Sequence, residues 1–332
     1  MIDDHALPAL ITAACAAYGL QQPARVEDLG GGFTTNLLLA GERALVLRAH
    51  PDGTDRDRLA AVQQARQAAW TAGLPTAPPI PTLGGDTFIE HTGMIIELEA
   101  YLPWTDRMNT SDRLITGFTM LGRLHDALRD ARLPAAAAIA PYANHLDRDH
   151  DRDVRAGLER LRAWRDHELT LYADHAEDHL AAVTAHEDPS PLPRRLCHGD
   201  FWDNNVGFTD TMITALLDFD FLGERERIDD LALPFWFWLL EPGRGLPTAE
   251  DRELLRSLAD AYDHGTDTPL TPTERRMLPV AIARQPAWSL GVWIRTHDDE
   301  PAIAHARAAA AELPTAQAVL ADLSVWQDRL TR

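Results

Sequence analysis

The segment HGDFWDNN, residues 198–205, places Asp200 and Asn205 five positions apart in a short polar stretch. Further along, an apolar run ends in Asp218, and Asp220 follows two residues later. Asp200 could accept a proton from a substrate hydroxyl. Asn205 and Asp218 offer the hard oxygen ligands that Mg²⁺ prefers on nucleotide phosphates. This spacing predicts a phosphoryl-transfer centre, whereas a plain loop would need only turn residues such as Asp and Asn.

A phosphatase is the rival interpretation of the same residues. The run Ile213–Leu217 ends in Asp-x-Asp, which is how phosphatases of the haloacid dehalogenase type begin, with the first Asp as nucleophile and the second as acid/base. Those enzymes usually add a Lys and usually place this strand near the N-terminus. This chain contains no Lys, and the strand lies two-thirds of the way along. The phosphatase interpretation also leaves HGDFWDNN without a role, so we favour a kinase.

Residues 196–232 resemble the aminoglycoside phosphotransferase family, a branch of the protein-kinase-like fold that includes antibiotic, choline and homoserine kinases. The resemblance extends over nearly the whole chain and is most specific in this segment. It implies an α+β, bilobal protein-kinase-like fold, with a mainly antiparallel nucleotide-binding lobe at residues 1–98. A helical lobe at residues 99–332 would carry the catalytic loop and the substrate site. The resemblance also implies ATP and Mg²⁺ as cofactors, Asp200 as base, His198 as the residue that orients the loop, and Asn205 and Asp218 as metal ligands.

The nucleotide site is expected in the N-terminal part. A glycine-rich stretch could fold over the ATP phosphates, with backbone N–H groups and Thr hydroxyls as donors; an ordinary hairpin turn is the alternative. The stretch lies one hairpin before Arg48, as the family pattern requires, and the resemblance places Arg48 on the α- and β-phosphates. Arg suits that role through its bidentate fork. The remaining nucleotide contacts expected from the resemblance are Gly31, Gly32, Phe33, Thr34 and Thr35 in the loop, and Glu97 and Glu99 in a linker lying against the base.

The sequence departs from the family pattern in the helix expected at Arg56–Ala72. That helix normally supplies a Glu that pairs with the phosphate-binding cation, but none occurs between Arg56 and Trp70. Gln63 best matches the position. Either its amide holds Arg48 more weakly than a carboxylate would, or a carboxylate elsewhere takes over.

The elements expected around these residues separate into two groups. An N-terminal helix (Asp4–Tyr18) precedes about five strands with one embedded helix, whereas the chain from Asp112 onward is mostly helical. Two short strands are expected within 196–220. Such segregation indicates α+β rather than alternating α/β structure. Within the helical part, 235–240 is apolar on all sides and predicts a buried helix, and Asp230 is expected to cap a helix and brace the catalytic loop.

Composition narrows the possible partners. The 332 residues include 51 acidic and 31 basic residues, which gives a net charge of −20, and every basic residue is Arg. A phosphate-binding or Schiff-base lysine is thereby excluded, and nucleic acid is not expected as a partner because it demands a basic surface. The acidity is compatible with a cationic substrate, although solubility alone explains it equally well.

The compartment is expected to be the cytoplasm. Two Cys give neither a disulfide framework nor zinc spacing. The Ala-rich start follows Asp3, Asp4 and His5 and contains Pro8, which favours a helix over a signal peptide. No apolar run approaches the ~20 residues of a membrane span, so no membrane partner is expected.

The predicted function is transfer of the ATP γ-phosphate to a hydroxyl of a small molecule. The favoured substrate is an aminoglycoside-like or other cationic antibiotic, which would make the enzyme an antibiotic-resistance factor. A metabolic kinase of the homoserine, choline or sugar type is the alternative. A catalytically inactive kinase-like binding protein is a further alternative, which loss of Asp200, Asn205 or Asp218 would have favoured. The sequence does not predict the oligomeric state.

Overall fold

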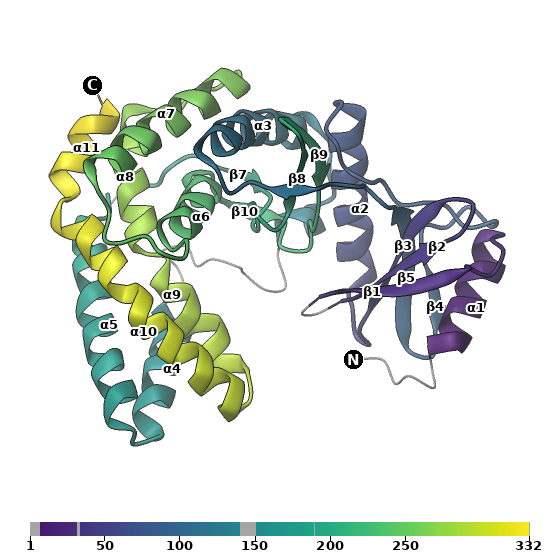
Figure 1. Cartoon of the computed structure of the whole chain (residues 1–332), viewed down its shortest axis with the longest axis horizontal. Coiled ribbons are helices and arrows are strands. Elements are labelled where there is room, and N and C mark those ends of the chain that lie inside the picture. The colour runs from purple at the N-terminus through teal and green to yellow at the C-terminus, as the bar shows by residue number, and fades with distance from the viewer. Residues whose placement is uncertain (1–6, 32–33, 140–150, 189, 332) are drawn as a thin grey trace.

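The structure is a computed structural model that describes residues 7–31, 34–139, 151–188 and 190–331. Figure 1 shows two lobes, one built on a sheet and the other on helices. The predicted α+β bilobal fold is therefore confirmed. The strand expected to lead into the lobe linker continues to Ala100, so the proposed boundary at residues 98/99 falls inside this strand.

The N-terminal lobe is a five-stranded antiparallel sheet in the order β1-β2-β3-β5-β4. A hairpin turn around Gly41 joins β2 to β3. The elements of this lobe are α1 (Leu7–Tyr18), β1 (Arg25–Gly30), β2 (Thr35–Ala40), β3 (Ala44–His50), α2 (Arg56–Thr71), β4 (Ile89–His91) and β5 (Met94–Ala100).

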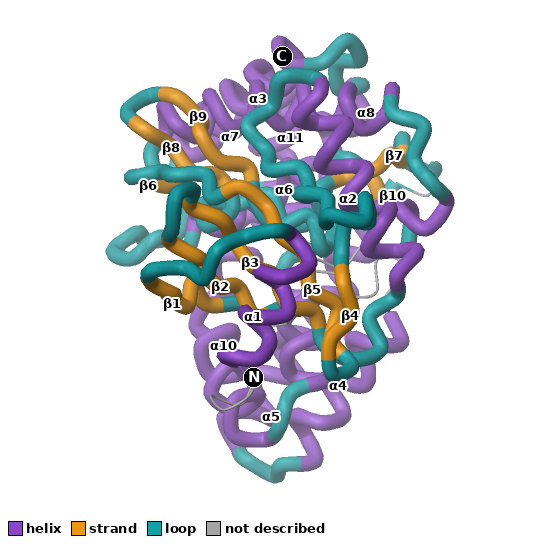
Figure 2. The backbone as a smooth tube through the Cα atoms, turned by 90° about the vertical axis from the view of Figure 1, so that its right-hand side faces the viewer, coloured by secondary structure: helices purple, strands orange, loops and turns teal. Residues whose placement is uncertain are grey.

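The two faces of this sheet differ in chemistry because strand side chains alternate. Leu47 and Ile96 belong to an apolar cluster that also contains α1 residues such as Leu10. Figure 2 shows α1 lying over this outer face. The opposite face carries Arg48 and Glu97, which are directly paired between β3 and β5. The side of the sheet toward the other lobe is therefore charged.

Helix α2 joins the lobes. Asp55 caps its N-terminus by accepting hydrogen bonds from two backbone N–H groups of the first turn. The helix contacts α3 (Ser111–Asp130) and the short 3₁₀ helix η1 (Ala135–Ala138) of the second lobe. From α2, Arg58 donates to the carbonyl oxygens of Ala137 at 2.9 Å and Asp220 at 3.1 Å. These bonds tie the helix to the segment that carries the predicted metal ligands.

The C-terminal lobe is mostly helical, as predicted. Its further elements are β6 (Asp106–Arg107), α4 (Asp151–Ala163), α5 (His167–His186), β7 (Arg194–Cys197), β8 (Val206–Thr209), β9 (Met212–Leu216), β10 (Gly223–Glu226), α6 (Ile228–Leu239), α7 (Ala249–Gly265), α8 (Pro272–Ala283), α9 (Pro286–Trp288), the π-helix η2 (Ser289–Ile294), α10 (Asp299–Ala321) and α11 (Leu323–Thr331).

Two small sheets in this lobe hold the predicted catalytic segment. Strands β6, β8 and β9 form one sheet, and β7 pairs with β10 in the other. The two strands expected within 196–220 are β8 and β9, and β7 ends just inside this segment at Cys197. Pairing of β8 with β6 joins residues about a hundred positions apart, as in Asp106 opposite Phe208, and local sequence patterns do not reveal such pairs.

The apolar helix α6 is buried along most of its length. Phe235, Trp236 and Leu239 lie in the main core of the lobe. The prediction of a buried helix is confirmed for most of its length, and Phe237 and Trp238 are half-buried. Phe237 packs against Trp202 of the catalytic loop, with ring centroids 4.3 Å apart. Among the helices of the described ranges, none has the length and apolarity needed to cross a membrane.

Candidate active site

The catalytic loop begins where β7 ends, at a sharp turn through Gly199. This residue has a φ of +82°, and a Cβ there would lie 2.2 Å from the carbonyl oxygen of Phe221. Any side chain would therefore collide with the backbone that follows the predicted metal ligands. The turn brings the loop and that segment into direct contact.

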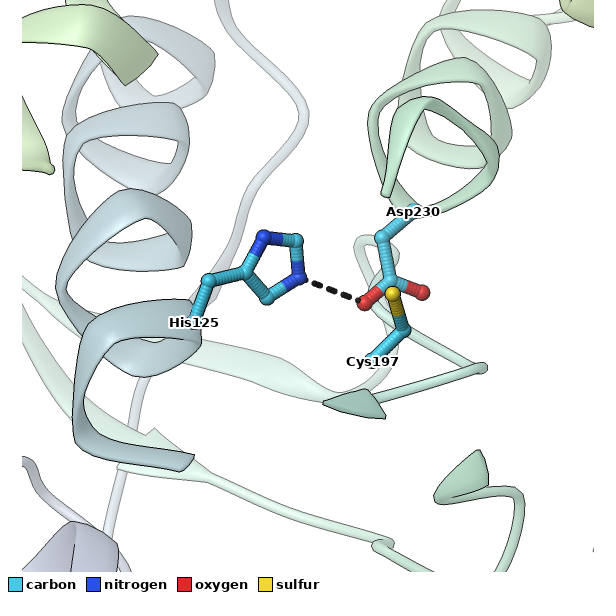
Figure 3. A group of neighbouring side chains, drawn as sticks. All are labelled: His125, Cys197 and Asp230. Carbon is cyan, nitrogen blue, oxygen red and sulfur yellow. Dashed lines mark hydrogen bonds and ion pairs between the residues drawn. The ribbon is translucent and has the colours of Figure 1, made fainter. Parts of the chain in front are cut away.

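Asp230 braces this turn from α6. Its two carboxylate oxygens accept hydrogen bonds from the backbone N–H groups of His198 at 2.6 Å and Gly199 at 2.8 Å. His125 of α3 adds a third bond at 3.0 Å (Figure 3). The predicted bracing is confirmed. The predicted capping was wrong, because α6 begins at Ile228 after Arg227, which makes no side-chain cap.

The group in Figure 3 also contains Cys197, so it has three side chains of types that bind metals. Both oxygens of Asp230 are already used by backbone donors. Burial raises the pKa of the Cys197 thiol well above its usual range, which keeps it neutral and a poor ligand. This group is a structural support for the loop.

His198 connects the loop to the end of β9, as expected for a residue that orients it. Its Nε2 lies 2.9 Å from the carbonyl oxygen of Leu217, and its Nδ1 accepts the backbone N–H of Asp200 at 3.2 Å. These partners select the neutral tautomer protonated on Nε2. Burial lowers the pKa of His198 to about 4, so the ring is uncharged at neutral pH.

Asp200 and Asn205 lie side by side in the loop. Asn205 Nδ2 donates to the Asp200 carboxylate at 2.7 Å and to its carbonyl oxygen at 2.9 Å. Burial and the nearby Asp218 carboxylate raise the pKa of Asp200 well above its usual range, against the effect of the Asn205 bond. A carboxylate with a raised pKa is a stronger base than an ordinary Asp carboxylate.

Asp218 follows β9 in a conformation that non-glycine residues rarely adopt. Its φ is +57°, and such outliers concentrate at functional sites. Arg48 Nη2 lies 3.6 Å from its carboxylate. Burial and the neighbouring Asp220 nevertheless raise the pKa of Asp218 to about 6. The site thus gathers more negative charge than Arg48 neutralises.

This donor set fits a divalent cation. Both recorded hydrogen bonds of Asn205 use Nδ2, which leaves the hard carbonyl oxygen Oδ1 for a metal. The Asp218 side chain is 39% exposed, and its carboxylate carries charge that a cation would neutralise. Amide and carboxylate oxygens are ligands of the kind that Mg²⁺ takes when nucleotide phosphates supply the others.

Arg48 reaches from the sheet to this segment. Its Nη2 lies 2.7 Å from Asp220, and its side chain is 5% exposed. Thr34 at the end of the glycine-rich loop donates to the same Asp220 oxygen at 3.4 Å. The predicted phosphate-binding loop and cation thus converge, from the other lobe, on the segment that carries the predicted metal ligand Asp218.

The glycine-rich loop is described only in part, since Gly32 and Phe33 lie outside the described residues. Gly31 has a φ of +146°, and a Cβ on it would lie 2.3 Å from the Thr34 carbonyl oxygen. Thr35 opens β2 opposite Ala49. The described part is thus a tight turn that leads from β1 to the Arg48 hairpin.

Gln63 does not contact Arg48. It donates instead to Glu97 at 2.8 Å. Among the described residues, Arg48 forms ion pairs with Asp220, Asp218 and Glu97. Of the two alternatives left open by the sequence, a carboxylate from elsewhere is the one realised. Glu97 and Glu99 both bond to Arg66, so their carboxylates face α2 from within β5.

Sequence reasoning missed Arg58 and Arg66 in α2. Both are buried, and each binds a part of the site: Arg58 the carbonyls after Asp218, and Arg66 the carboxylates of β5. A signal was present. Two arginines inside an Ala-rich helix, with Arg66 three residues after Gln63 on the same face, are typical of charged groups meeting partners in the core.

The chain matches the sequence model of the phosphotransferase enzyme family over residues 25–277. An uncharacterised protein of Deinococcus radiodurans is 27% identical over 294 residues, covering 86% of this chain and 81% of that protein. A homoserine kinase of Acidiphilium cryptum is 33% identical over 115 residues, and this match spans about a third of each protein (33% and 34%).

Solved structures share the fold across the whole chain. A microcompartment-associated aminopropanol kinase has a TM-score of 0.71 at 18% identity, covering 98% of this chain and 99% of its own. The amicoumacin kinase hAmiN, solved with AMP-PNP, Ca²⁺ and Ami, has a TM-score of 0.69 at 13% identity, covering 97% and 94%. The family match decides against the dehalogenase-type phosphatase. The chain belongs to the phosphotransferase enzyme family, and it is a phosphotransferase.

Proposed function

We propose that this phosphotransferase moves the γ-phosphate of ATP to a hydroxyl group of a small molecule, with Mg²⁺ as cofactor. The observation that carries the proposal is that three groups lie close together: a carboxylate that can accept a proton, a predicted metal site and an arginine that can bind phosphate. Asp200 and Asn205 are bonded to each other, Asp218 affects the pKa of Asp200, and Arg48 lies 3.6 Å from Asp218. Phosphoryl transfer needs little more than this positioning and charge neutralisation.

Each residue has one proposed task. Asp200 accepts the proton of the attacking hydroxyl, and His198 and Asp230 hold the backbone that presents it. Asn205 Oδ1 and Asp218 would hold the magnesium ion, which neutralises phosphate charge when bound. Arg48 would bind the α- and β-phosphates, and the stretch Gly31–Thr35 would cover them. Because ATP is a cytoplasmic nucleotide, we expect the reaction in the cytoplasm.

We propose a cationic hydroxyl compound as substrate, with an aminoglycoside-like or other cationic antibiotic as the first candidate. The net charge of −20 supports a positively charged ligand, since it raises the local concentration of cations. The fold shared with an amicoumacin kinase and a spectinomycin phosphotransferase supports an antibiotic. Antibiotic resistance would be the corresponding biological role.

A metabolic kinase is the second candidate, because one of the two reported sequence relatives is a homoserine kinase. The aminopropanol kinase fold supports the same candidate. An ATP-consumption assay over a library of hydroxyl compounds separates the two. The library should pair each aminoglycoside with amino alcohols and hydroxy amino acids, and Asp200→Asn protein should serve as control. Turnover of antibiotics alone would select the first candidate, and turnover of homoserine or an amino alcohol alone would select the second.

A further inference from the structure

One carboxylate partner of Arg48 comes from a neighbouring strand. Helix α2 contains one acid, Asp57 in its first turn, and none that faces Arg48. Glu97 of β5 lies directly opposite Arg48 in the strand pairing, and its Oε1 is 4.0 Å from Arg48 Nη1. Opposed residues of paired strands share a face and hold their side chains close together. A strand therefore supplies the carboxylate that the helix lacks.

Glu97 is held from several sides at once. Its Oε1 lies 3.1 Å from His50 Nε2, and its Oε2 accepts from Gln63 at 2.8 Å and from Arg66. The Glu97 side chain is 1% exposed. Burial opposes its ionisation, but Arg66, helped by His50 and Arg48, lowers the pKa of Glu97 well below its usual range. Burial raises the pKa of Glu99, the second carboxylate that pairs with Arg66.

Helix α2 links this arrangement to the metal-binding segment. From the middle of the helix, Arg66 and Gln63 donate hydrogen bonds to the Glu97 carboxylate. Near the start of the helix, Arg58 donates to the carbonyl oxygen of Asp220. Arg48 lies between these two anchors, 2.7 Å from the Asp220 carboxylate. The same helix therefore contacts Glu97 and the backbone of Asp220, which are two of the three carboxylate residues near Arg48.

Stability alone is a poor reason for this arrangement. Buried ion pairs are often no better for stability than apolar residues of similar size, since their desolvation offsets their attraction. We propose that Glu97 is the positioning residue for Arg48 and that Arg66 holds Glu97 in place for it. In the family pattern a carboxylate of the helix pairs with the phosphate-binding cation. Here the carboxylate is Glu97 of strand β5, and helix α2 instead supplies Arg66, the cation that holds Glu97. This inference rests on the proposed role of Arg48 on the ATP phosphates.

The test compares MgATP with adenosine, which lacks the phosphates that Arg48 would bind. Glu97→Gln should weaken MgATP binding about tenfold by isothermal titration calorimetry, because Arg48 loses the charge of the carboxylate that orients it. Adenosine affinity should stay unchanged. Glu90→Gln is the matched control, because Glu90 of β4 also pairs with α2, through Arg56 at 2.7 Å, but is half exposed. It should change neither affinity.

Arg66→Gln is a second variant, which keeps Glu97 but removes its ion pair with Arg66. It should also weaken MgATP binding and leave adenosine affinity unchanged. Arg48→Gln separates the inference from the proposed function. If Arg48→Gln binds MgATP normally, the proposed phosphate role fails. If Arg48→Gln weakens MgATP while folded Glu97→Gln or Arg66→Gln protein does not, the positioning role is refuted. An equal loss of MgATP and adenosine affinity in either variant would also refute it, because that outcome marks a general structural role.

Discussion

Removal of the Asp230 carboxylate should both destabilise the protein and slow its reaction. Asp230 is fully buried and accepts three hydrogen bonds, from the backbone N–H groups of His198 and Gly199 and from His125. Asp230→Ala leaves these three buried donors without their acceptor. Each such donor costs about 1–3 kcal/mol, so the combined loss should be about 3–6 kcal/mol because neighbouring effects do not add fully.

This loss is a large share of the roughly 5–15 kcal/mol that stabilises a typical domain. Urea unfolding followed by circular dichroism measures it. Asp230→Asn keeps the size and one acceptor oxygen, so its midpoint should lie between those of Asp230→Ala and wild type. Asp299→Ala is the control: Asp299 also accepts two hydrogen bonds, from Arg160 and Trp164, but its side chain is 70% exposed. It should leave the urea midpoint almost unchanged.

The kinetic effect separates bracing from simple stability. Asp230 fixes the backbone that presents Asp200, so folded Asp230→Asn protein should lose kcat more than MgATP affinity. If Asp230→Ala unfolds at the same urea concentration as Asp299→Ala, the hydrogen-bond account of the loop is wrong. A normal kcat in Asp230→Asn would contradict the proposed coupling between Asp230 and Asp200.

Three further predictions concern the metal site and the substrate. Asp218→Ala should abolish magnesium-dependent ATP binding in a calorimetric titration, and no covalent phosphoaspartate should form on the wild-type protein; trapping one would overturn the kinase mechanism. Because the folded protein raises the pKa of Asp218 to about 6, protons should compete with the metal as the pH falls through that value. Magnesium-dependent ATP affinity should then fall by up to about tenfold per pH unit below 6, and a flat profile from pH 7 to 5 would argue against Asp218 as ligand. If the substrate is a polyamine-like antibiotic, kcat/KM at saturating MgATP should fall steeply as salt shortens the ~10 Å Debye length, whereas an uncharged best substrate would remove the compositional support for an antibiotic.

The parts of the site that lie close together in sequence were predictable. Asp200, Asn205 and Asp218 belong to one short segment, and the end of an apolar strand locates Asp218. The α+β fold followed from the segregation of strand and helix patterns. These features depend on local spacing, which a single sequence displays.

The parts that depend on long-range pairing were not predictable. Glu97 lies opposite Arg48 only because β3 and β5 pair in a particular register. That register cannot be predicted from the sequence of either strand alone. From position in the chain, Glu97 was expected in a linker against the nucleotide base. In the structure it lies inside a strand with its carboxylate bonded to Arg66 of α2. The arrival of Arg66 at this carboxylate depends in turn on how α2 packs on the sheet.

The most direct test of the central claim is phosphoryl transfer by wild-type and Asp200→Asn protein in parallel. Each protein is incubated with MgATP and the best substrate from the hydroxyl library, and the product is followed by ³¹P NMR. We predict a phosphomonoester on a substrate hydroxyl, formed ~10²–10⁴-fold more slowly by Asp200→Asn protein with unchanged MgATP affinity. A phosphomonoester formed at near wild-type rate by Asp200→Asn protein would contradict the assignment of Asp200 as the base.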